Sequence, residues 1–251
     1  MPCARAPDPK LNETEEMNQP HLGLIVPPKA GEVPIDGPLL YGTRIRFSAR
    51  GLGLGEISTR GYTEVIDSVI GKALELKEEG VSAISLMGTS LSFFRGAAFN
   101  RQLEVEMSRA TGLPCTTMSN AIVEGLRSLG VKRVAVATAY IDEVNVQLRR
   151  YLEQSDFEAL AIEGLSISDV QAVGQVGTQV LVDLGRRVFE ARPGADGILI
   201  SCGGLVTLDA VRELESVLKV PVVSSSPAGF RDLVRKAGLD ARSPGNGRLF
   251  D

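Results

Sequence analysis

Short apolar runs alternate along this chain with longer stretches in which apolar residues recur at helical spacing. Between Tyr62 and Glu79 the apolar positions return every three or four residues, which predicts a helix that ends at Gly80. Strands are predicted over residues 22–26, 44–49, 83–86, 115–118, 133–138, 158–162, 197–201 and 222–224. Further helices are predicted over residues 93–111, 121–129, 142–154, 178–191, 208–217 and 228–237. The segment 29–59 is rich in turn-forming residues and carries one predicted strand.

This alternation predicts an α/β fold, because successive strand–helix units build parallel sheets with right-handed crossovers and helices on both faces. Ligands of such sheets bind at the carboxyl ends of the strands. Small polar residues follow strand after strand in this chain, so the sequence predicts a polar rim at that edge.

Two stretches of the chain look like copies of one another. One ends in Met87-Gly-Thr-Ser90 and the other in Ser201-Cys-Gly-Gly204, and each is followed by a second matching piece, around Pro114 and Pro221. The copies predict two similar Rossmann-like halves, related by a pseudo-twofold axis, with the active site in the cleft between them. The halves are expected to be intertwined within residues 21–250. One would comprise roughly 21–50 with 130–240, and the other 51–130.

Composition narrows the classes of function. A net charge of −4 and a pI near 5.3 give no support for nucleic-acid binding, and no run approaches the roughly 20 apolar residues of a membrane helix. The first 20 residues are polar and lack the apolar core of a signal peptide. We therefore expect a cytoplasmic protein with a disordered tail over residues 1–20.

Cysteine and histidine are scarce. The three cysteines, Cys3, Cys115 and Cys202, have no metal-ligand spacing, and His21 is the single histidine. One histidine excludes a two-histidine metal site, and only this imidazole could serve a serine–histidine triad. No metal site is therefore expected. Cys115 lies within a predicted strand and favours core packing.

Two turns carry candidate chemistry. Gly88, Thr89 and Ser90 follow a strand and open a helix, where hydroxyls and backbone N–H groups can receive an anion or simply cap the helix. Cys202 ends the matching strand beside Gly203, where a ligand can approach. Its thiol can exchange a proton with a carbanion, or it can be a small apolar residue in the core. Because Gly88 stands where a second thiol could lie, the asymmetry suggests proton chemistry on one face of a carbon.

Two further features border this rim. Tyr140 follows a strand and can donate its phenol to an oxyanion, or be an ordinary half-buried aromatic. Gly51–Gly55 lacks the spacing of a dinucleotide fingerprint. Its glycines instead favour a loop that lets the backbone approach a ligand, with Leu54 and Ile57 as an apolar wall.

These motifs resemble those of the arylmalonate decarboxylases, a branch of the aspartate/glutamate/hydantoin racemase and maleate isomerase superfamily. The resemblance spans about residues 22–250. It is carried by Ile25–Pro28, Gly51–Gly55, Ser85–Phe93, Arg95–Asn100, Thr111–Ser119, Ala135–Asp142, Leu199–Leu205, Val220–Phe230 and Gly247–Phe250. Racemases that resemble this chain carry a second cysteine where it has Gly88.

The resemblance implies cofactor-free decarboxylation of 2-aryl-2-alkylmalonates to one enantiomer of a 2-arylalkanoic acid. It implies that Cys202 protonates an enediolate on one face. It assigns a dioxyanion hole to Thr89, Ser90, Tyr140 and the backbone N–H of Gly203, with Gly88 beside them. It assigns the apolar positions around the departing carboxylate to Pro27, Leu54, Ile57, Val170 and Val173.

The resemblance implies a small aryl diacid as the substrate, and it favours a monomer. Two alternatives remain open at the level of sequence. A racemase or isomerase of the same superfamily would need two opposed cysteines, against which Gly88 speaks. A non-catalytic carboxylate-binding protein could share the fold, because fold alone does not establish activity.

Overall fold

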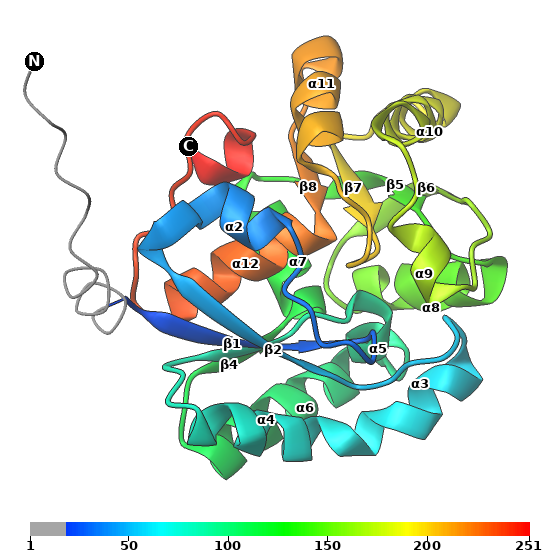
Figure 1. Ribbon diagram of the computed structural model, residues 1–251. Helices are drawn as coiled ribbons and strands as arrows, with labels where there is room; N and C mark the ends of the chain where they lie inside the picture. Colours follow the sequence, from blue (N-terminus) through cyan, green and yellow to red (C-terminus); the bar gives the residue numbers. More distant parts are fainter. Residues whose placement is uncertain (1–18) are drawn as a thin grey trace, which may run out of the picture.

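The computed structural model describes residues 19–251, so residues 1–18 of the predicted tail lie outside it. Its strands form two parallel four-stranded sheets (Figure 1). The first sheet has the order β2 (Arg46–Gly51), β1 (His21–Val26), β3 (Ile84–Leu86) and β4 (Cys115–Thr117). The second has the order β6 (Glu158–Gly164), β5 (Arg133–Thr138), β7 (Gly197–Ser201) and β8 (Val222–Ser224). The two halves thus share one strand order, and the predicted α/β fold with two similar halves is confirmed.

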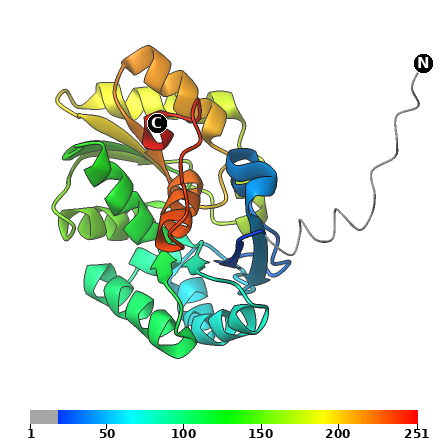
Figure 2. The same cartoon turned by 90° about the vertical axis from the view of Figure 1, so that its left-hand side faces the viewer.

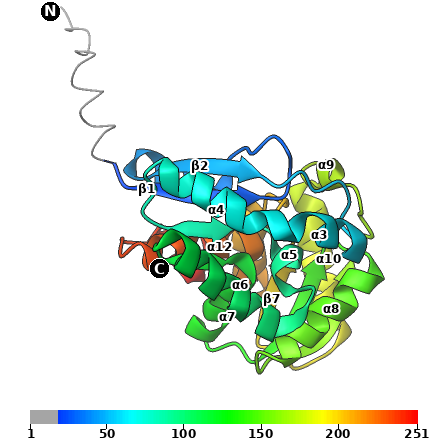
Figure 3. The ribbon, with the colours of Figure 1, turned by 90° about the horizontal axis from the view of Figure 1, so that it is seen from below.

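Helices connect these strands and cover the sheets. They are α2 (Asp36–Tyr41), α3 (Thr59–Val65), α4 (Val69–Glu78), α5 (Thr89–Phe93), α6 (Gly96–Thr111), α7 (Met118–Ser128), α8 (Asp142–Glu153), α9 (Val170–Val173), α10 (Thr178–Ala191), α11 (Leu208–Leu218) and α12 (Ser225–Lys236). Helices α4 and α6 lie side by side on the outer face of the first sheet (Figure 3). The short helices α2 and α9 were not predicted, since neither is long enough to show an apolar period.

Helices begin earlier than the sequence pattern predicts. Helix α7 starts at Met118, directly after β4, because the Thr117 hydroxyl accepts a hydrogen bond from the Asn120 N–H at 3.2 Å. In the same way α5 starts at Thr89 and α12 at Ser225, each close behind its strand. The amino ends of these helices therefore lie at the carboxyl ends of the strands, where a ligand is expected.

The strand pairing does not follow the predicted division of the chain into halves. Residues 21–50 were grouped with 130–240, but β1 pairs with β2 and β3 of the first sheet. Consecutive strand–helix units stay in one sheet because right-handed crossovers return each strand to the sheet that the chain has just left. The halves are intertwined through α12, which follows the last strand of the second sheet and packs on α7, β3 and β4 (Figure 2).

The core is continuous through both halves. Every residue of β1, β3, β4, β7 and β8 is buried, as expected of parallel strands covered on both faces. Within residues 19–251 no helix has the length and apolar character needed to cross a membrane.

Candidate active site

A cavity of about 440 Å³ lies where the carboxyl ends of strands from the two sheets meet. The turns after β1, β3 and β7 line it, together with the loop before α3 and with helix α9. The predicted site residues that line this cavity are Pro27, Leu54, Ile57, Gly88, Thr89, Ser90, Val170, Val173, Cys202 and Gly203. Tyr140 is the one predicted site residue that does not line it.

The turns after β3 and β7 face each other at close range. A Cβ atom added to Gly203 would lie 3.0 Å from the backbone oxygen of Met87 and 2.9 Å from Sδ of Met118. One added to Gly88 would lie 2.8 Å from Cδ1 of Leu91 and 3.3 Å from Cγ of Pro27. Glycine at both positions therefore lets the two backbones approach and leaves room for a ligand between them.

Cys202 follows the last residue of β7, with only 7% of its surface exposed. Its backbone N–H donates to the Ser225 hydroxyl at 3.2 Å, which holds the turn against α12. Burial raises the pKa of the thiol to about 11, against the opposing effect of hydrogen bonds from the Gly204 N–H and the Tyr140 hydroxyl. The thiol therefore keeps its proton at neutral pH, as a proton donor must.

Thr89 and Ser90 are buried in the first turn of α5, and their hydroxyls do not cap the helix. The capping position is Gly88, which has no side-chain capping bond. The Thr89 hydroxyl donates instead to the thioether sulfur of Met118 at 2.8 Å, and a thioether is a weak acceptor. An anion in the cavity offers this hydroxyl a stronger partner.

Tyr140 lies behind the cavity wall and is completely buried. Its ring packs edge-on against that of Phe93, with 5.9 Å between the ring centroids. Its oxygen accepts a hydrogen bond from the Ser201 hydroxyl at 3.4 Å. Burial raises its pKa well above the ordinary value of a phenol, and its hydroxyl lies within hydrogen-bonding reach of both Cys202 and Thr89. The Tyr140 hydroxyl therefore lies within reach of one residue from each turn, Thr89 after β3 and Cys202 after β7.

The apolar wall is built from two loops that are distant in sequence. The Ile57 N–H donates to the Ser168 oxygen at 2.9 Å, and Glu56 forms an antiparallel bridge with Asp169. This pairing places Leu54 and Ile57 beside α9. Side chains of this kind favour a neutral group over a carboxylate, because a buried charge without partners is costly.

Two polar residues at this site were not predicted. Tyr62 is buried, and its hydroxyl lies beside Ser90 without a hydrogen-bond partner among the described residues. Asp36, the first residue of α2, lines the cavity and is 1% exposed. In the sequence, Tyr62 is the first residue of a predicted amphipathic helix, and nothing there distinguishes it from a residue of the apolar face. The only signal for Asp36 is one acidic residue in the otherwise apolar stretch Val33–Leu40.

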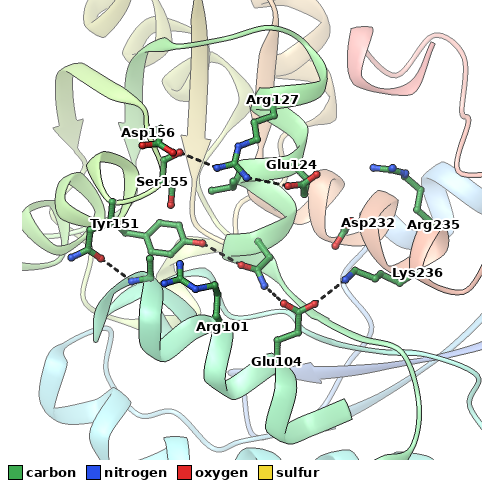
Figure 4. A pocket seen from close by; sticks show the side chains of 14 residues that line it. Arg101, Glu104, Glu124, Arg127, Tyr151, Ser155, Asp156, Asp232, Arg235 and Lys236 are labelled. Atoms are coloured by element: carbon green, nitrogen blue, oxygen red, sulfur yellow. Dashed lines mark hydrogen bonds and ion pairs between the residues drawn. The ribbon is translucent and has the colours of Figure 1, made fainter. Parts of the chain in front are cut away.

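A second cavity, of about 540 Å³, lies among α6, α7, α8 and α12 (Figure 4). Charged side chains line it, and several of them pair with one another. Lys236 pairs with Glu104 at 2.8 Å and Arg127 with Glu124 at 3.3 Å, while Asn120 donates to Glu104 (Figure 4). None of the predicted site residues lies here.

Comparison with known proteins gives one consistent family. A family model described as arylmalonate decarboxylase matches residues 22–250. The chain is 56% identical over 238 residues to the arylmalonate decarboxylase of Bordetella bronchiseptica, covering 94% of this chain and 99% of that protein. It is 25% identical to a maleate isomerase of Nocardia farcinica, over 91% of this chain and 94% of the isomerase.

Solved structures agree in fold. The crystal structure of an arylmalonate decarboxylase variant in its liganded form superposes with a TM-score of 0.91 at 55% identity, covering 93% of this chain and 99% of that one. The maleate isomerase of Pseudomonas putida S16 superposes with a TM-score of 0.83 at 23% identity, over 92% of this chain and 97% of the isomerase. At that identity the second likeness concerns the fold alone.

Proposed function

The chain belongs to the arylmalonate decarboxylase family, and from that premise we propose that it converts 2-aryl-2-alkylmalonates to 2-arylalkanoic acids of one hand without a cofactor. The observation that carries this proposal is that Cys202 is the single thiol among the described residues that line the cavity. Cys202 is buried and protonated, and it lies between an apolar wall and the hydroxyls of the opposite turn. That arrangement suits loss of CO2 followed by delivery of one proton to one face of a carbon.

The carboxylate that the substrate retains would bind at the turn after β3. The hydroxyls of Thr89 and Ser90 and the N–H of Gly203 border the same cavity, and the sulfur that accepts from Thr89 is a weak competitor. As the enediolate forms, negative charge grows on the retained carboxylate oxygens. Donors already oriented toward them then stabilise the transition state more than the bound substrate. Tyr140 supports this hole from behind, through Thr89.

The departing carboxylate would face the apolar wall of Leu54, Ile57, Val170 and Val173. A carboxylate there loses hydration that the wall does not replace, whereas CO2 is neutral and has no such need. The bond between the α-carbon and this carboxylate breaks, and its electron pair passes to the α-carbon and the retained carboxylate. The products of this step are CO2 and an enediolate, and the aryl ring delocalises part of the charge.

Cys202 would then complete the reaction. Its S–H bond breaks, the proton forms a C–H bond at the α-carbon, and a thiolate remains. The Tyr140 hydroxyl and the Gly204 N–H hydrogen-bond the sulfur and stabilise that thiolate. Water returns the proton to the thiolate before the next turnover. Because Gly88 lines the cavity on the other turn, no thiol within residues 19–251 would approach the opposite face of the carbon.

The rival functions make different demands on the site. A racemase or isomerase with two cysteines would need a thiol at Gly88, and a carboxylate-binding protein would bind an arylalkanoic acid without releasing CO2 from any malonate. We also propose that the enzyme acts as a monomer, as the family resemblance implies.

The test is CO2 release and product chirality with 2-methyl-2-phenylmalonate, in buffer without added metal or cofactor. We expect CO2 release and one dominant enantiomer of 2-phenylpropanoate. A racemic product would contradict protonation by one thiol, and the absence of CO2 would contradict the reaction. The same assay on Cys202→Ala tests the role of the thiol. Cys115→Ala is the matched control for that variant, because it removes a buried thiol in β4, outside the cavity.

A further inference from the structure

Asp36 brings an unpaired carboxyl group to the substrate cavity. It is the first residue of α2, lines the cavity and is 1% exposed, and its Oδ1 has no hydrogen-bond partner among the described residues. The hydroxyl of Ser226, in the first turn of α12, is also buried, and it lies beside this carboxyl and lowers its pKa by hydrogen bonding. One hydroxyl satisfies only part of the acceptor capacity of a carboxylate, and buried polar groups of folded proteins are nearly always hydrogen-bonded, so this carboxyl at a ligand cavity still lacks a partner.

The position of this carboxyl is held by packing. Helix α2 packs on α12 (Figure 1), and a Cβ atom added to Gly37 would lie 2.4 Å from the ring of Phe230. Such close contact with a large buried ring leaves α2 little freedom to turn the carboxyl elsewhere. The unpaired oxygen is therefore a property of the fold at this point and not of a loosely held side chain.

Asp36 and Cys202 occupy separate parts of the cavity wall. Burial raises the pKa of Asp36 to about 6, opposed only by the Ser226 hydroxyl, and no charged group contributes. The pKa of Cys202 depends instead on burial, Gly204 and Tyr140. The apolar wall belongs to α9 and the loop before α3, and Figure 1 shows α2 lying apart from both α9 and α3. Asp36 therefore faces a part of the substrate other than its reacting carbon and departing carboxylate.

The chemistry of the group defines what it can bind. At neutral pH a carboxyl with this pKa is mostly ionised and accepts hydrogen bonds without donating any. An acceptor or an anion would be repelled, whereas an O–H or N–H donor would replace the hydration that the carboxylate lost on burial. On a malonate bound by its carboxylates elsewhere, the remaining groups are the alkyl and the aryl substituents, and of these the larger aryl ring offers several positions for such a donor.

We propose that Asp36, with Ser226 beside it, determines substrate specificity by accepting a hydrogen bond from an O–H or N–H group on the aryl ring. The preferred substrates are then hydroxyaryl- or aminoarylmalonates and not the plain phenyl compound. This inference rests on the proposed decarboxylase function.

The experiment compares three ring substituents, hydrogen, hydroxyl and methoxyl, of which only the hydroxyl is a hydrogen-bond donor. kcat/KM is measured for 2-methyl-2-arylmalonates whose ring is phenyl, hydroxyphenyl or methoxyphenyl, with the substituent in the meta and para positions. We expect the better hydroxyphenyl isomer to exceed its methoxy counterpart by about tenfold or more, because a site built to accept from a donor discriminates against analogues without one. Asp36→Leu should abolish the preference and Asp36→Asn should lower it several-fold.

Glu32→Gln is the matched control. Glu32 is another carboxylate that borders the same cavity, but its side chain is exposed to water. We expect this variant to keep the wild-type ratio of hydroxyphenyl to methoxyphenyl. A similar loss of preference in Glu32→Gln and Asp36→Asn would overturn the proposal, since a general effect of negative charge would then account for it.

Binding separates this inference from the proposed function. Calorimetry on the wild type and on Asp36→Asn gives Kd for 2-(hydroxyphenyl)propanoates and their methoxy analogues, whether or not any malonate releases CO2. Tighter binding of the hydroxy compound to the wild type alone supports the inference. Equal Kd values, or turnover of phenylmalonate with no preference for the hydroxyl, would overturn it and leave the decarboxylase function standing.

Discussion

The turns after β3 and β7 occupy matching places in two similar halves, yet their chemistry differs. The first presents the hydroxyls of Thr89 and Ser90, and the second presents the thiol of Cys202 and the backbone of Gly203. Each turn follows a strand with the same place in its sheet. Strand β3 lies between β1 and β4, and β7 lies between β5 and β8. Two turns in equivalent positions of similar halves thus carry different side chains. The difference teaches that symmetry of fold need not mean symmetry of reaction.

Packing distinguishes the two turns as well. The atoms that confine Gly203 include a backbone oxygen, that of Met87, which is held by its own strand. The atom nearest to an added Cβ at Gly88 is the far end of the flexible Leu91 side chain. The turn after β3 therefore has more freedom to accept a new side chain than the turn after β7.

The strongest way to break the comparison is to remove the thiol. We expect Cys202→Ala to lower kcat by roughly 10²–10⁴-fold, because the proton donor for the enediolate is lost. CO2 release at saturating 2-methyl-2-phenylmalonate measures the effect. Near-normal kcat in Cys202→Ala would refute the assigned role, while Cys115→Ala should retain wild-type turnover.

Removing a hydroxyl from the opposite turn should lower the rate but keep the hand of the product. Thr89→Val retains the shape of the side chain and removes one donor, so we expect kcat to fall by about 10²-fold. Chiral chromatography of the product should show unchanged enantiomeric excess, because Cys202 still delivers the proton. If Thr89→Val changed the hand and not the rate, the roles of the two turns would have to be exchanged.

Adding a side chain at each glycine tests the difference in packing. Gly203→Ala should lower both kcat and Tm, since its Cβ would press on the Met87 backbone oxygen. Overpacking of this kind costs about 1–3 kcal/mol. Thermal unfolding measures Tm of Gly203→Ala and of Gly88→Ala, which is the matched comparison. The Gly88 variant should lose less stability because Leu91 can move, and an equal loss would contradict the inference drawn from packing.

Gly88→Cys should make the two turns chemically alike. A thiol there would face the cavity from the side opposite Cys202, so the variant should exchange the α-proton of a 2-arylpropanoate and racemise it. Enantiomeric excess after long incubation measures this, with the wild type as control. An excess that stays constant in the variant would show that the two positions do not address opposite faces of one carbon.

The smallest effect concerns pH. Because the pKa of Cys202 is about 11 and the protonated thiol is the reactive form, kcat should stay level through neutral pH and fall as pH rises through about 11. A pH profile of kcat, limited to the range in which circular dichroism shows the native fold, tests this. A decline centred near pH 8.5 would mean that the thiol is not desolvated during turnover.

The comparison also shows how far each part of the molecule could be predicted. The alternation of apolar runs and helical spacing predicted every strand and most of the helices, and the repeated motifs predicted two halves around one site. The positions of Thr89 and Cys202 at strand ends were enough to place both in the cavity. The pairing of β1 with β3 was not predicted, because the pattern shows that a strand is buried but not which neighbour buries it.

The sequence by itself determined the fold class and the asymmetry between Gly88 and Cys202, because both depend on residue type and spacing along the chain. Only the tertiary structure decided the surroundings of each group. It placed Tyr140 behind the cavity wall, raised the pKa of Cys202 by burial, and brought Asp36 beside Ser226 from 190 residues away. Burial and hydrogen bonding between distant segments depend on how the elements pack. A thiol or a carboxyl therefore acquires its working protonation state only in the folded chain.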